Sequence, residues 1–319
     1  MRLRAVGTQR AAELAVAVVL AATAGGGLSG CSTTTDASPR SSTPTVRTTP
    51  PTTPPTTRDP KVTVTMTGLP LVDGSRPVVS GATVLATQRD LPTFVWAPAG
   101  SGPFPLVVFV HGYDKGPLDY QRFCSVLASA GYVVAAPSFP LEDPARGFPL
   151  DRTHLSDEAT DVAFVITSLE GDGSLRIDGS RIAVVGHSDG ADVALLVGYG
   201  TGSVDPRVGA VVADAPDPMA VTTVASHVPL LLVQGTSDSV VPYSSSQTVY
   251  GQVDAPVSYL SLLGADHLAP IAGGTPWTPV LDDAVARFLD ATVAGRGPGA
   301  GSLASELSSS PLVRFTTKG

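Results

Sequence analysis

The feature that most constrains the fold is a series of short, continuous apolar runs separated by segments with helical periodicity. The apolar runs are Leu106–Val110, Tyr132–Ala136, Ile182–Val185, Val208–Ala213, Leu230–Val233 and Val257–Leu262. The helical patterns are Leu118–Ala130, Ser156–Leu169, Ala191–Tyr199, Ser244–Gln252 and Pro279–Ala294. Continuous apolar runs are typical of parallel strands buried on both faces. The alternation therefore predicts an α/β fold with a mostly parallel central sheet and helices on both faces.

The two ends of this region have different patterns. Three β-like segments come before the first apolar run with no helix between them: Val62–Thr67, Ala82–Gln88 and Thr93–Trp96. They predict an antiparallel N-terminal edge. We expect a single domain over 61–295, followed by a flexible Gly/Ser-rich tail over 296–319. Within that tail, Leu312–Phe315 is an alternative candidate for an edge strand.

Residues 1–30 have the pattern of a secretory signal. Arg2, Arg4 and Arg10 precede the apolar run Leu14–Ala24, and small residues follow it. The run is shorter than the roughly 20 apolar residues that span a bilayer. The final Leu-Ser-Gly-Cys, ending at Cys31, resembles the bacterial lipobox, whose cysteine is lipidated. We expect a lipoprotein anchored through Cys31 to the outer face of the cell membrane. The alternatives are a plain secretory signal and an uncleaved anchor.

Residues 31–60 are expected to form a tether. Of the 29 residues from Ser32 to Pro60, 22 are Ser, Thr or Pro, a composition that cannot bury a core. After residue 60 the chain has 14 Lys and Arg against 25 Asp and Glu. An acidic body without a basic cluster argues against a nucleic-acid partner. The two cysteines, Cys31 and Cys124, exclude a disulfide framework and a Cys-rich zinc site.

The strongest chemical signal is the sequence Gly186-His187-Ser188-Asp189-Gly190. It has the G-x-S-x-G pattern of a nucleophile elbow, in which a serine occupies a sharp strand-to-helix turn. A buried strand is predicted directly before it and a helix directly after it, as the motif requires. The helix N-terminus would then point at developing negative charge. We therefore expect Ser188 to be a nucleophile, the alternative being a tight glycine turn.

A second site follows the run Leu106–Val110, at His111-Gly112-Tyr113. The backbone N–H groups of Tyr113 and Asp189 are the candidate donors of an oxyanion hole. We expect the Asp189 side chain to point away from the hole and to interact with the helix N-terminus. His111 is expected to brace the loop, with general-base catalysis as the alternative. The Tyr113 ring either lines the substrate cleft or is a plain surface aromatic.

The orienting acid and the general base should follow the serine in the chain. Asp238 comes after the run Leu230–Val233, on a Gly-x-x-Asp turn that can aim a carboxylate. Asp214, at the end of the preceding strand, is the rival. His267 follows the run Val257–Leu262, so the order Ser188, Asp238, His267 matches the expected order of a catalytic triad.

These motifs together resemble the α/β-hydrolase superfamily. The residues that carry the resemblance are Leu91–Pro98, Phe104–Gly112, Gly131–Pro137, Gly186–Gly190 and Ala265–His267. The chain is most similar to the dienelactone-hydrolase-like, chlorophyllase-like and platelet-activating-factor-acetylhydrolase-like esterases and lipases. Dienelactone hydrolases use a cysteine nucleophile, and dehalogenases and epoxide hydrolases use aspartate, so Ser188 argues against those reactions.

The resemblance implies a serine carboxylic-ester hydrolase that works through an acyl-enzyme, without a metal or cofactor, and we expect a monomer. Residues 214–229 leave no room for a large lid, which favours short-chain or bulky esters, polyesters included. The segment Pro137–His154 either shapes an acyl pocket or caps the sheet. Two other interpretations are a peptidase or acyltransferase on the same triad, and a non-catalytic surface binding protein on a hydrolase scaffold.

Overall fold

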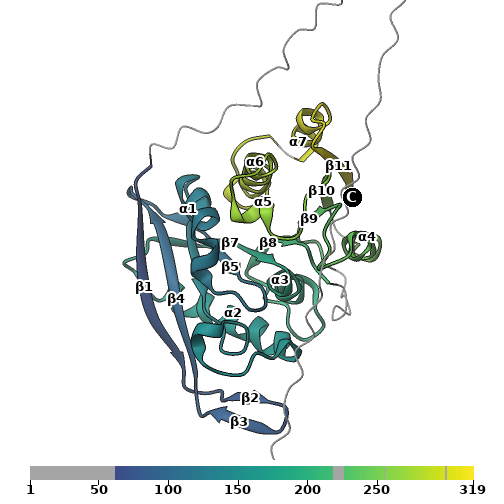
Figure 1. The fold of residues 1–319 in the computed structure, drawn as a ribbon. Coiled ribbons are helices and arrows are strands. Elements are labelled where there is room, and N and C mark those ends of the chain that lie inside the picture. Colours follow the sequence, from purple (N-terminus) through teal and green to yellow (C-terminus); the bar gives the residue numbers. More distant parts are fainter. Residues whose placement is uncertain (1–61, 218–225, 255, 299) are drawn as a thin grey trace, which may run out of the picture. The chain divides into compact units, whose positions relative to one another are not determined.

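The computed structural model describes residues 62–217, 226–254, 256–298 and 300–319. Within these ranges a nine-stranded sheet has the order β1-β4-β6-β5-β7-β8-β9-β10-β11 (Figure 1). The strands are β1 (Val64–Asp73), β4 (Arg89–Pro98), β5 (Phe104–Val110), β6 (Val133–Pro137), β7 (Ile177–His187), β8 (Val208–Asp214), β9 (Leu230–Gly235), β10 (Val257–Leu262) and β11 (Val313–Lys318). The six strands from β6 to β10 in this order are parallel, which confirms the predicted mostly parallel sheet.

The N-terminal edge is antiparallel, as predicted. β1 pairs with β4 along its whole length, and β4 pairs with β6 in the same antiparallel sense. The segment Ala82–Gln88 does not join this sheet. Its strand β3 (Thr83–Ala86) instead pairs with β2 (Val78–Ser80) in a separate two-stranded sheet. The alternating pattern correctly predicted a strand there, but pattern alone does not specify which strand it pairs with.

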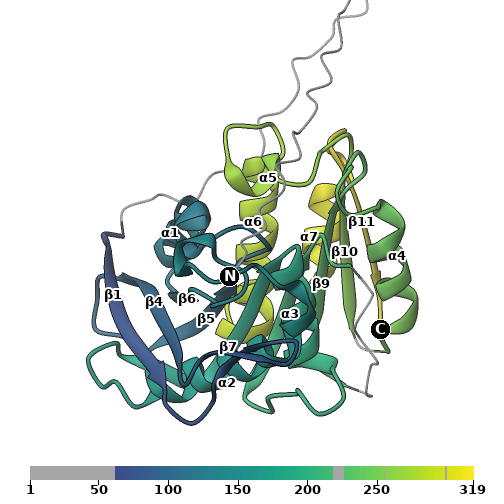
Figure 2. The same ribbon diagram turned by 60° about the horizontal axis from the view of Figure 1, so that its bottom comes forward.

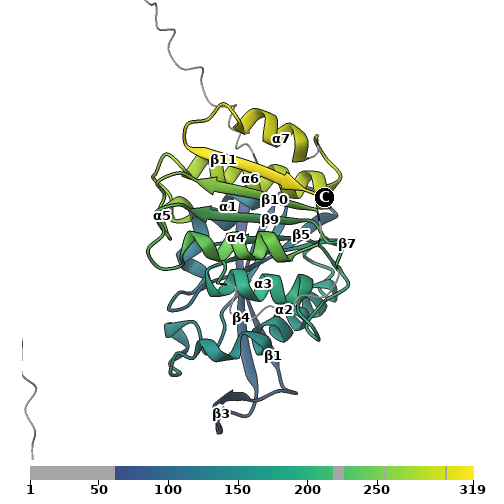
Figure 3. The same cartoon turned by 90° about the vertical axis from the view of Figure 1, so that its right-hand side faces the viewer.

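Helices cover both faces of the sheet, as Figures 2 and 3 show. The helices are α1 (Gln121–Ser129), α2 (Leu155–Glu170), α3 (Asp189–Tyr199), α4 (Tyr243–Gln252), α5 (Ala269–Ala272), α6 (Thr278–Leu289) and α7 (Ala300–Leu307). Short 3-10 turns cover Pro117–Tyr120, Pro144–Arg146 and Arg152–His154, and a π-helical turn covers Asp290–Ala294. Buried residues of α2, α3 and α4 belong to one apolar cluster, and those of α1, α5, α6 and α7 belong to a second.

The two apolar clusters lie on opposite faces of the strands. In β5, Leu106, Val108 and Val110 belong to the first cluster, while Val107 and Phe109 belong to the second. This is the two-residue period of a strand whose faces are both covered. It explains why the sequence is apolar without interruption at β5 and does not alternate with polar residues.

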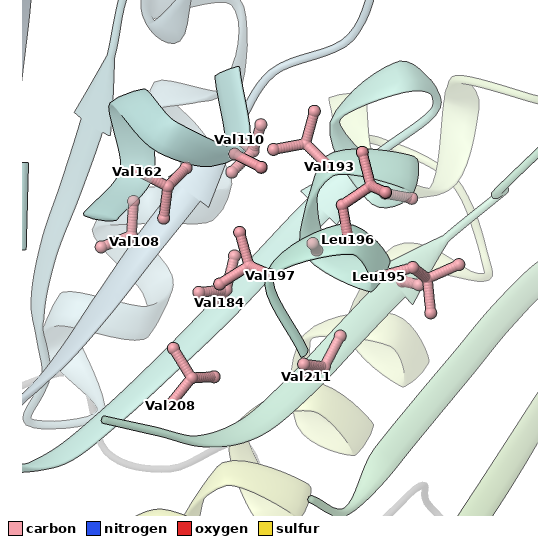
Figure 4. Close-up of a cluster of buried hydrophobic side chains, with 14 of the residues drawn as sticks. Val108, Val110, Val162, Val184, Val193, Leu195, Leu196, Val197, Val208 and Val211 are labelled. Atoms are coloured by element: carbon pink, nitrogen blue, oxygen red, sulfur yellow. The ribbon is translucent and has the colours of Figure 1, made fainter. Parts of the chain in front are cut away.

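Helix α3 is buried along its whole length, from Asp189 to Tyr199. Figure 4 shows Val193 and Val197 of this helix pointing toward Val110 of β5 and Val184 of β7. Burial of a valine or leucine side chain contributes about 1.5–3 kcal/mol to stability. This packing therefore fixes α3 against the strand that precedes it in the chain, and with it the turn that joins the two.

The predicted flexible tail over 296–319 is wrong. Residues 300–307 form α7, and β11 pairs antiparallel with β10 as the last strand of the sheet. The alternative, an edge strand at Leu312–Phe315, is correct in kind, although β11 continues to Lys318. Leu303 and Leu307 lie in the second apolar cluster, one helical turn apart. This spacing indicates one buried face of a helix, but the Gly/Ser-rich composition of the segment led to the prediction of a flexible tail.

Residues 1–61 lie outside the described residues, so the signal segment 1–30, Cys31 and the tether 31–60 are not tested. Residues 218–225, between β8 and β9, also lie outside them. In the described part of the chain, none of the helices has the length and apolarity needed to cross a membrane.

We predict that Leu303→Ala lowers the free energy of unfolding by about 2 kcal/mol or more, because it removes a buried side chain and leaves a cavity. Leu303 is only 3% exposed. Chemical denaturation measures the change. The exposed Ser305 on the same helix gives the matched control Ser305→Ala, expected within about 0.5 kcal/mol of wild type. Equal stability of the two variants would contradict the docking of α7.

Candidate active site

A pocket of about 340 Å³ lies where the parallel strands end. Most of its lining comes from the loops that follow β5, β7, β8, β9 and β10, and includes Tyr113, Ser188, Asp217, Val240 and His267. Ligands of open α/β sheets bind at this carboxyl edge of the strands. The pocket therefore brings together the loops in which the sequence placed the candidate nucleophile, oxyanion donors and base.

Ser188 occupies the sharp turn between β7 and α3. Its backbone has φ 58° and ψ −128°, a conformation that is strained for a residue with a side chain. Close packing on both sides holds it: a Cβ at Gly186 would lie 1.9 Å from the Gly190 carbonyl oxygen, and a Cβ at Gly190 would lie 2.2 Å from that of Val110. Only glycine fits at these two positions. The Ser188 N–H donates to the Asp214 carbonyl oxygen at 2.9 Å, which ties the turn to β8.

His267 and Asp238 are in direct contact at the wall of the pocket. The Nδ1 atom of His267 lies 2.8 Å from Oδ2 of Asp238. The Asp238 side chain is fully buried and also accepts hydrogen bonds from the Gln234 side chain and from the backbone N–H groups of Val240 and Val241. Four donors thus fix one carboxylate. With Nδ1 donating to Asp238, Nε2 of His267 is left as the acceptor of a neutral imidazole.

The loops that hold this pair are joined to each other. The Ser237 N–H donates to the Ala265 carbonyl oxygen at 2.9 Å, and the Gly264 N–H donates to the Thr236 hydroxyl at 2.8 Å. Asp214, the rival acid, is buried and its carboxyl has a pKa raised well above the usual range, because burial disfavours the charge and Asp238 repels it. The acid that contacts His267 is Asp238.

Two residues that line the pocket together with Ser188 have backbone N–H groups without a hydrogen-bond partner among the described residues. They are Tyr113 and Asp189, the candidate oxyanion donors. Gly112 brings the first of them close: a Cβ at Gly112 would lie 3.0 Å from both the Ser188 Cβ and the His187 carbonyl oxygen. The second is at the N-terminus of α3, whose dipole favours negative charge there. The side chain of Tyr113 lines the pocket and is 41% exposed.

We expected the Asp189 carboxylate to interact with the N-terminus of α3, and this expectation is wrong. The carboxylate accepts two hydrogen bonds from Arg152, from Nε at 3.0 Å and from Nη2 at 2.6 Å. Arg152 also lies 3.8 Å from the Asp217 carboxylate. Because Arg152 precedes Asp189 by 37 residues in the sequence, local pattern gave no signal for this pair.

His187, between Gly186 and Ser188, links the loops through its two ring nitrogens. Nε2 lies 2.9 Å from the His267 carbonyl oxygen, which can only accept, so Nε2 carries the proton. Nδ1 then accepts from the Tyr120 hydroxyl at 3.0 Å, and the Tyr120 oxygen accepts from the Gly112 N–H at 3.3 Å. Burial, together with the nearby His267, lowers the pKa of His187 to about 4, so the ring is neutral near pH 7. No role for His187 or Tyr120 was predicted from the sequence.

His111 has the bracing position that we expected. It is buried, its Nε2 accepts the Phe139 N–H at 3.1 Å, and its Nδ1 lies 3.1 Å from the Gly112 carbonyl oxygen. The segment Pro137–His154 mainly caps the sheet: Phe139 belongs to the first apolar cluster, and of the segment only Arg152 lines the pocket.

Three buried carboxyl groups interact electrostatically with Asp189. Burial and the charge of Asp189 raise the pKa of Glu142 to about 8 and that of Asp192 to about 9. Burial also raises the pKa of Glu158, with Glu142 contributing. Glu142 and Asp192 are therefore mostly neutral at pH 7, whereas the Asp189 carboxylate is hydrogen-bonded to Arg152. Nowhere in the described ranges do three or more His, Cys, Asp or Glu side chains form a group that could hold a metal ion.

Comparison with known proteins places the chain in a family. The family model described as Chlorophyllase matches residues 77–244, more than half of the chain. Chlorophyllase-1 of Citrus sinensis is 28% identical over 182 residues, which are 55% of this chain and 51% of the relative. Chlorophyllase-1 of Arabidopsis thaliana is 26% identical over 126 residues, 39% and 38% of the two chains. The chain thus spans about half or less of the length of these curated relatives.

A solved structure shows the same fold. The ferulic acid esterase from Streptomyces cinnamoneus superposes with a TM-score of 0.63 at 21% identity, covering 84% of this chain and 98% of that one. At this identity the likeness speaks for the fold and not for the substrate. The family match, the parallel sheet and the serine on its strand-to-helix turn agree: the chain has the α/β-hydrolase fold and belongs to the chlorophyllase family.

Proposed function

We propose that the protein is a serine carboxylic-ester hydrolase with Ser188 as nucleophile, His267 as general base and Asp238 as orienting acid. The observation that carries the proposal is the 2.8 Å contact between His267 Nδ1 and Asp238 Oδ2, in a pocket that also exposes Ser188 on its strained turn. Membership of a family whose curated relatives are called chlorophyllases supports ester hydrolysis as the reaction class.

The mechanism follows from the positions of these groups. Nε2 of His267 takes the hydroxyl proton of Ser188 as the serine oxygen attacks the ester carbonyl carbon. The carbonyl oxygen becomes negative and accepts hydrogen bonds from the Tyr113 and Asp189 N–H groups. His267 then gives its proton to the leaving alcohol. Water, deprotonated by His267, attacks the acyl-enzyme, releases the carboxylic acid and restores the Ser188 hydroxyl.

Asp238 contributes in two ways. Its carboxylate holds the proton on Nδ1, so that Nε2 is available as the base, and it stabilises the imidazolium that forms in each half-reaction. Its four hydrogen bonds keep the carboxylate in one orientation through both steps. Removal of the negative charge would leave His267 free to adopt the wrong tautomer.

The chain of hydrogen bonds through Tyr120 and His187 serves alignment. It begins at Gly112, next to the proposed oxyanion donor Tyr113, and ends at the carbonyl oxygen of His267, the proposed base. Because the loops after β5 and β10 are both tied to the β7 turn, a shift of either loop breaks a buried hydrogen bond. We propose Tyr120 and His187 as positioning residues, since their side chains act through other groups.

The rim of the pocket favours apolar substrates. Tyr113, Val240 and Leu268 are large hydrophobic side chains that line it while remaining 41%, 66% and 38% exposed. The sequence between β8 and β9, residues 215–229, is short for a helical lid. We therefore propose short-chain or bulky esters as substrates and expect little activation at a lipid–water interface. We also propose that Cys31 carries a lipid anchor, which would hold the enzyme at the outer face of the cell membrane.

Hydrolysis of p-nitrophenyl esters of increasing acyl length tests the proposal. We predict that the protein hydrolyses the shorter esters and that Ser188→Ala lowers kcat by at least about a thousandfold, because the acyl-enzyme no longer forms. Equal rates for wild type and Ser188→Ala would show that Ser188 is not the nucleophile. Release of products in the presence of added alcohol distinguishes hydrolysis from acyl transfer.

A pair of aspartates supplies a matched control for the same assay. Asp238→Asn removes the charge that orients His267 and should lower kcat by about 10³–10⁴-fold. Asp214→Asn replaces a buried carboxyl that does not contact His267 and whose pKa burial raises, and should retain most of the activity. The reverse pattern would assign the orienting acid to Asp214.

We predict that Tyr120→Phe lowers kcat/KM by about tenfold, or about 1.4 kcal/mol in the activation barrier, because the loops lose their link. Tyr132→Phe is the matched control. Tyr132 is equally buried and its hydroxyl donates to Asp290 at 2.7 Å, away from the pocket. Each variant loses a buried hydroxyl and some stability. Steady-state kinetics well below both unfolding transitions compares them, and equal kcat/KM values would reduce Tyr120 to a structural role.

A further inference from the structure

The pocket contains two basic side chains that differ in their surroundings. Arg152 donates two hydrogen bonds to Asp189 and lies 3.8 Å from Asp217, so its charge is matched by carboxylates. Lys115 also lines the pocket and is half-buried. Over the described ranges, Lys115 forms no hydrogen bond or ion pair through its ammonium group. The pocket therefore has one cation without an anionic partner.

Basic side chains are fewer than acidic ones in this chain. Lys and Arg number 20 against 28 Asp and Glu, and only three of the 20 are lysines: Lys61, Lys115 and Lys318. An ammonium group with three donors that is partly removed from water gains from a charged acceptor. Lys115 thus provides a local positive charge in a protein whose overall field is negative.

The backbone around Lys115 is held at both ends. On one side, the Gly112 N–H donates to the Tyr120 hydroxyl. On the other side, the Gly116 N–H donates to the Asp119 carboxylate at 2.8 Å, and the Asp119 N–H donates to the Gly116 carbonyl oxygen at 3.1 Å. The ammonium group is therefore carried by a fixed loop, two residues after the proposed oxyanion donor Tyr113. Because the backbone that carries the Lys115 side chain is already ordered, less conformational entropy is lost when a ligand binds.

The positive charge of Lys115 acts on the turn that carries Ser188. It is one of the groups that lower the pKa of His187, the residue directly before Ser188. The apolar rim formed by Tyr113, Val240 and Leu268 surrounds the same pocket. A ligand that matches both features has an apolar part for the rim and an anionic group for Lys115.

We propose that Lys115 is a specificity-determining residue that binds a carboxylate carried by an otherwise apolar ester substrate. The proposal rests on the proposed esterase function and names its substrate class. A single negative charge suits the site better than a dianion, because Asp217, whose carboxylate is partly exposed, lines the same pocket and would repel the second charge. The carboxylate belongs either to the acyl part or to the alcohol part, and two pairs of substrates separate these cases.

The first pair places the charge on the acyl part: the mono-4-nitrophenyl ester of adipic acid and 4-nitrophenyl hexanoate, which have the same chain length. The second pair places it on the alcohol part: 3-carboxyphenyl hexanoate and phenyl hexanoate. For each pair the measured quantity is the ratio of kcat/KM for the anionic ester to that for the neutral ester. The ratio cancels any general loss of activity or of folded protein.

We expect Lys115→Met to lower this ratio by about tenfold in at least one pair, mainly through a higher KM for the anionic ester. Lys115→Arg should restore most of it, since the charge returns. The wild-type ratio should fall as salt is added, because the interaction is partly exposed. Lys318→Met is the matched control: it removes the same charge from β11, where the ammonium lies 5.0 Å from the Tyr250 ring centroid, and should leave the ratio unchanged.

The outcomes are distinct. An unchanged ratio in both pairs for Lys115→Met would overturn the proposal, and so would an equal loss of kcat for anionic and neutral esters, which would assign Lys115 to transition-state stabilisation. If wild type hydrolyses neither neutral ester while a stoichiometric serine probe also fails to label Ser188, the proposed function itself fails. Hydrolysis of the neutral esters with an unchanged ratio overturns only the role of Lys115.

Discussion

The close backbone contact at the strand-to-helix turn determines the geometry of the rest of the site. β5, β7 and α3 meet at this turn. A Cβ at Gly186 would overlap the carbonyl oxygen of Gly190, and a Cβ at Gly190 would overlap that of Val110. The strained conformation of Ser188 costs on the order of 1–3 kcal/mol. It persists because the surrounding packing leaves the backbone of the turn no other conformation. The fully buried α3 supplies that packing. The same close contact brings Gly112, in the loop after β5, beside Ser188, the proposed nucleophile.

Hydrogen bonds then extend this local geometry to loops that are far apart in the sequence. Tyr120 and His187 connect the loop after β5 to the loop after β10, while backbone bonds join the loops after β9 and β10. Each loop follows a parallel strand of the sheet, so strand order decides which loops are neighbours. The neutral state of His187 is part of this arrangement, because a protonated ring would donate from both nitrogens and lose its bond from Tyr120.

The sequence predicted the features that depend on local pattern. Buried parallel strands are apolar on both faces, so their runs were visible, and Gly186 and Gly190 marked the turn because no side chain fits at these two positions. The antiparallel N-terminal edge followed from the lack of helices between its strands. Chain order pointed to Asp238 and His267, and the structure shows the two in contact.

The features that the sequence did not predict depend on contacts between distant segments. The partner of Asp189 is Arg152, from a 3-10 turn far from α3 in the sequence, and no local rule connects them. The chain through Tyr120 and His187 depends on how β5 and β7 lie side by side. The tail was misjudged because its Gly/Ser composition outweighed two leucines, and only the exposed edge of β10 gives β11 a partner.

The most direct test of the central claim is the reaction of the protein with a fluorophosphonate, followed by digestion and mass spectrometry to locate the adduct. The reagent labels a serine only if a base raises its nucleophilicity. We expect one stoichiometric adduct, on Ser188, and much slower labelling of Asp238→Asn, in which His267 loses its orientation. An adduct on a different serine, or labelling of Ser188→Ala at the rate of wild type, would contradict the assignment of this pocket as a serine-hydrolase active site.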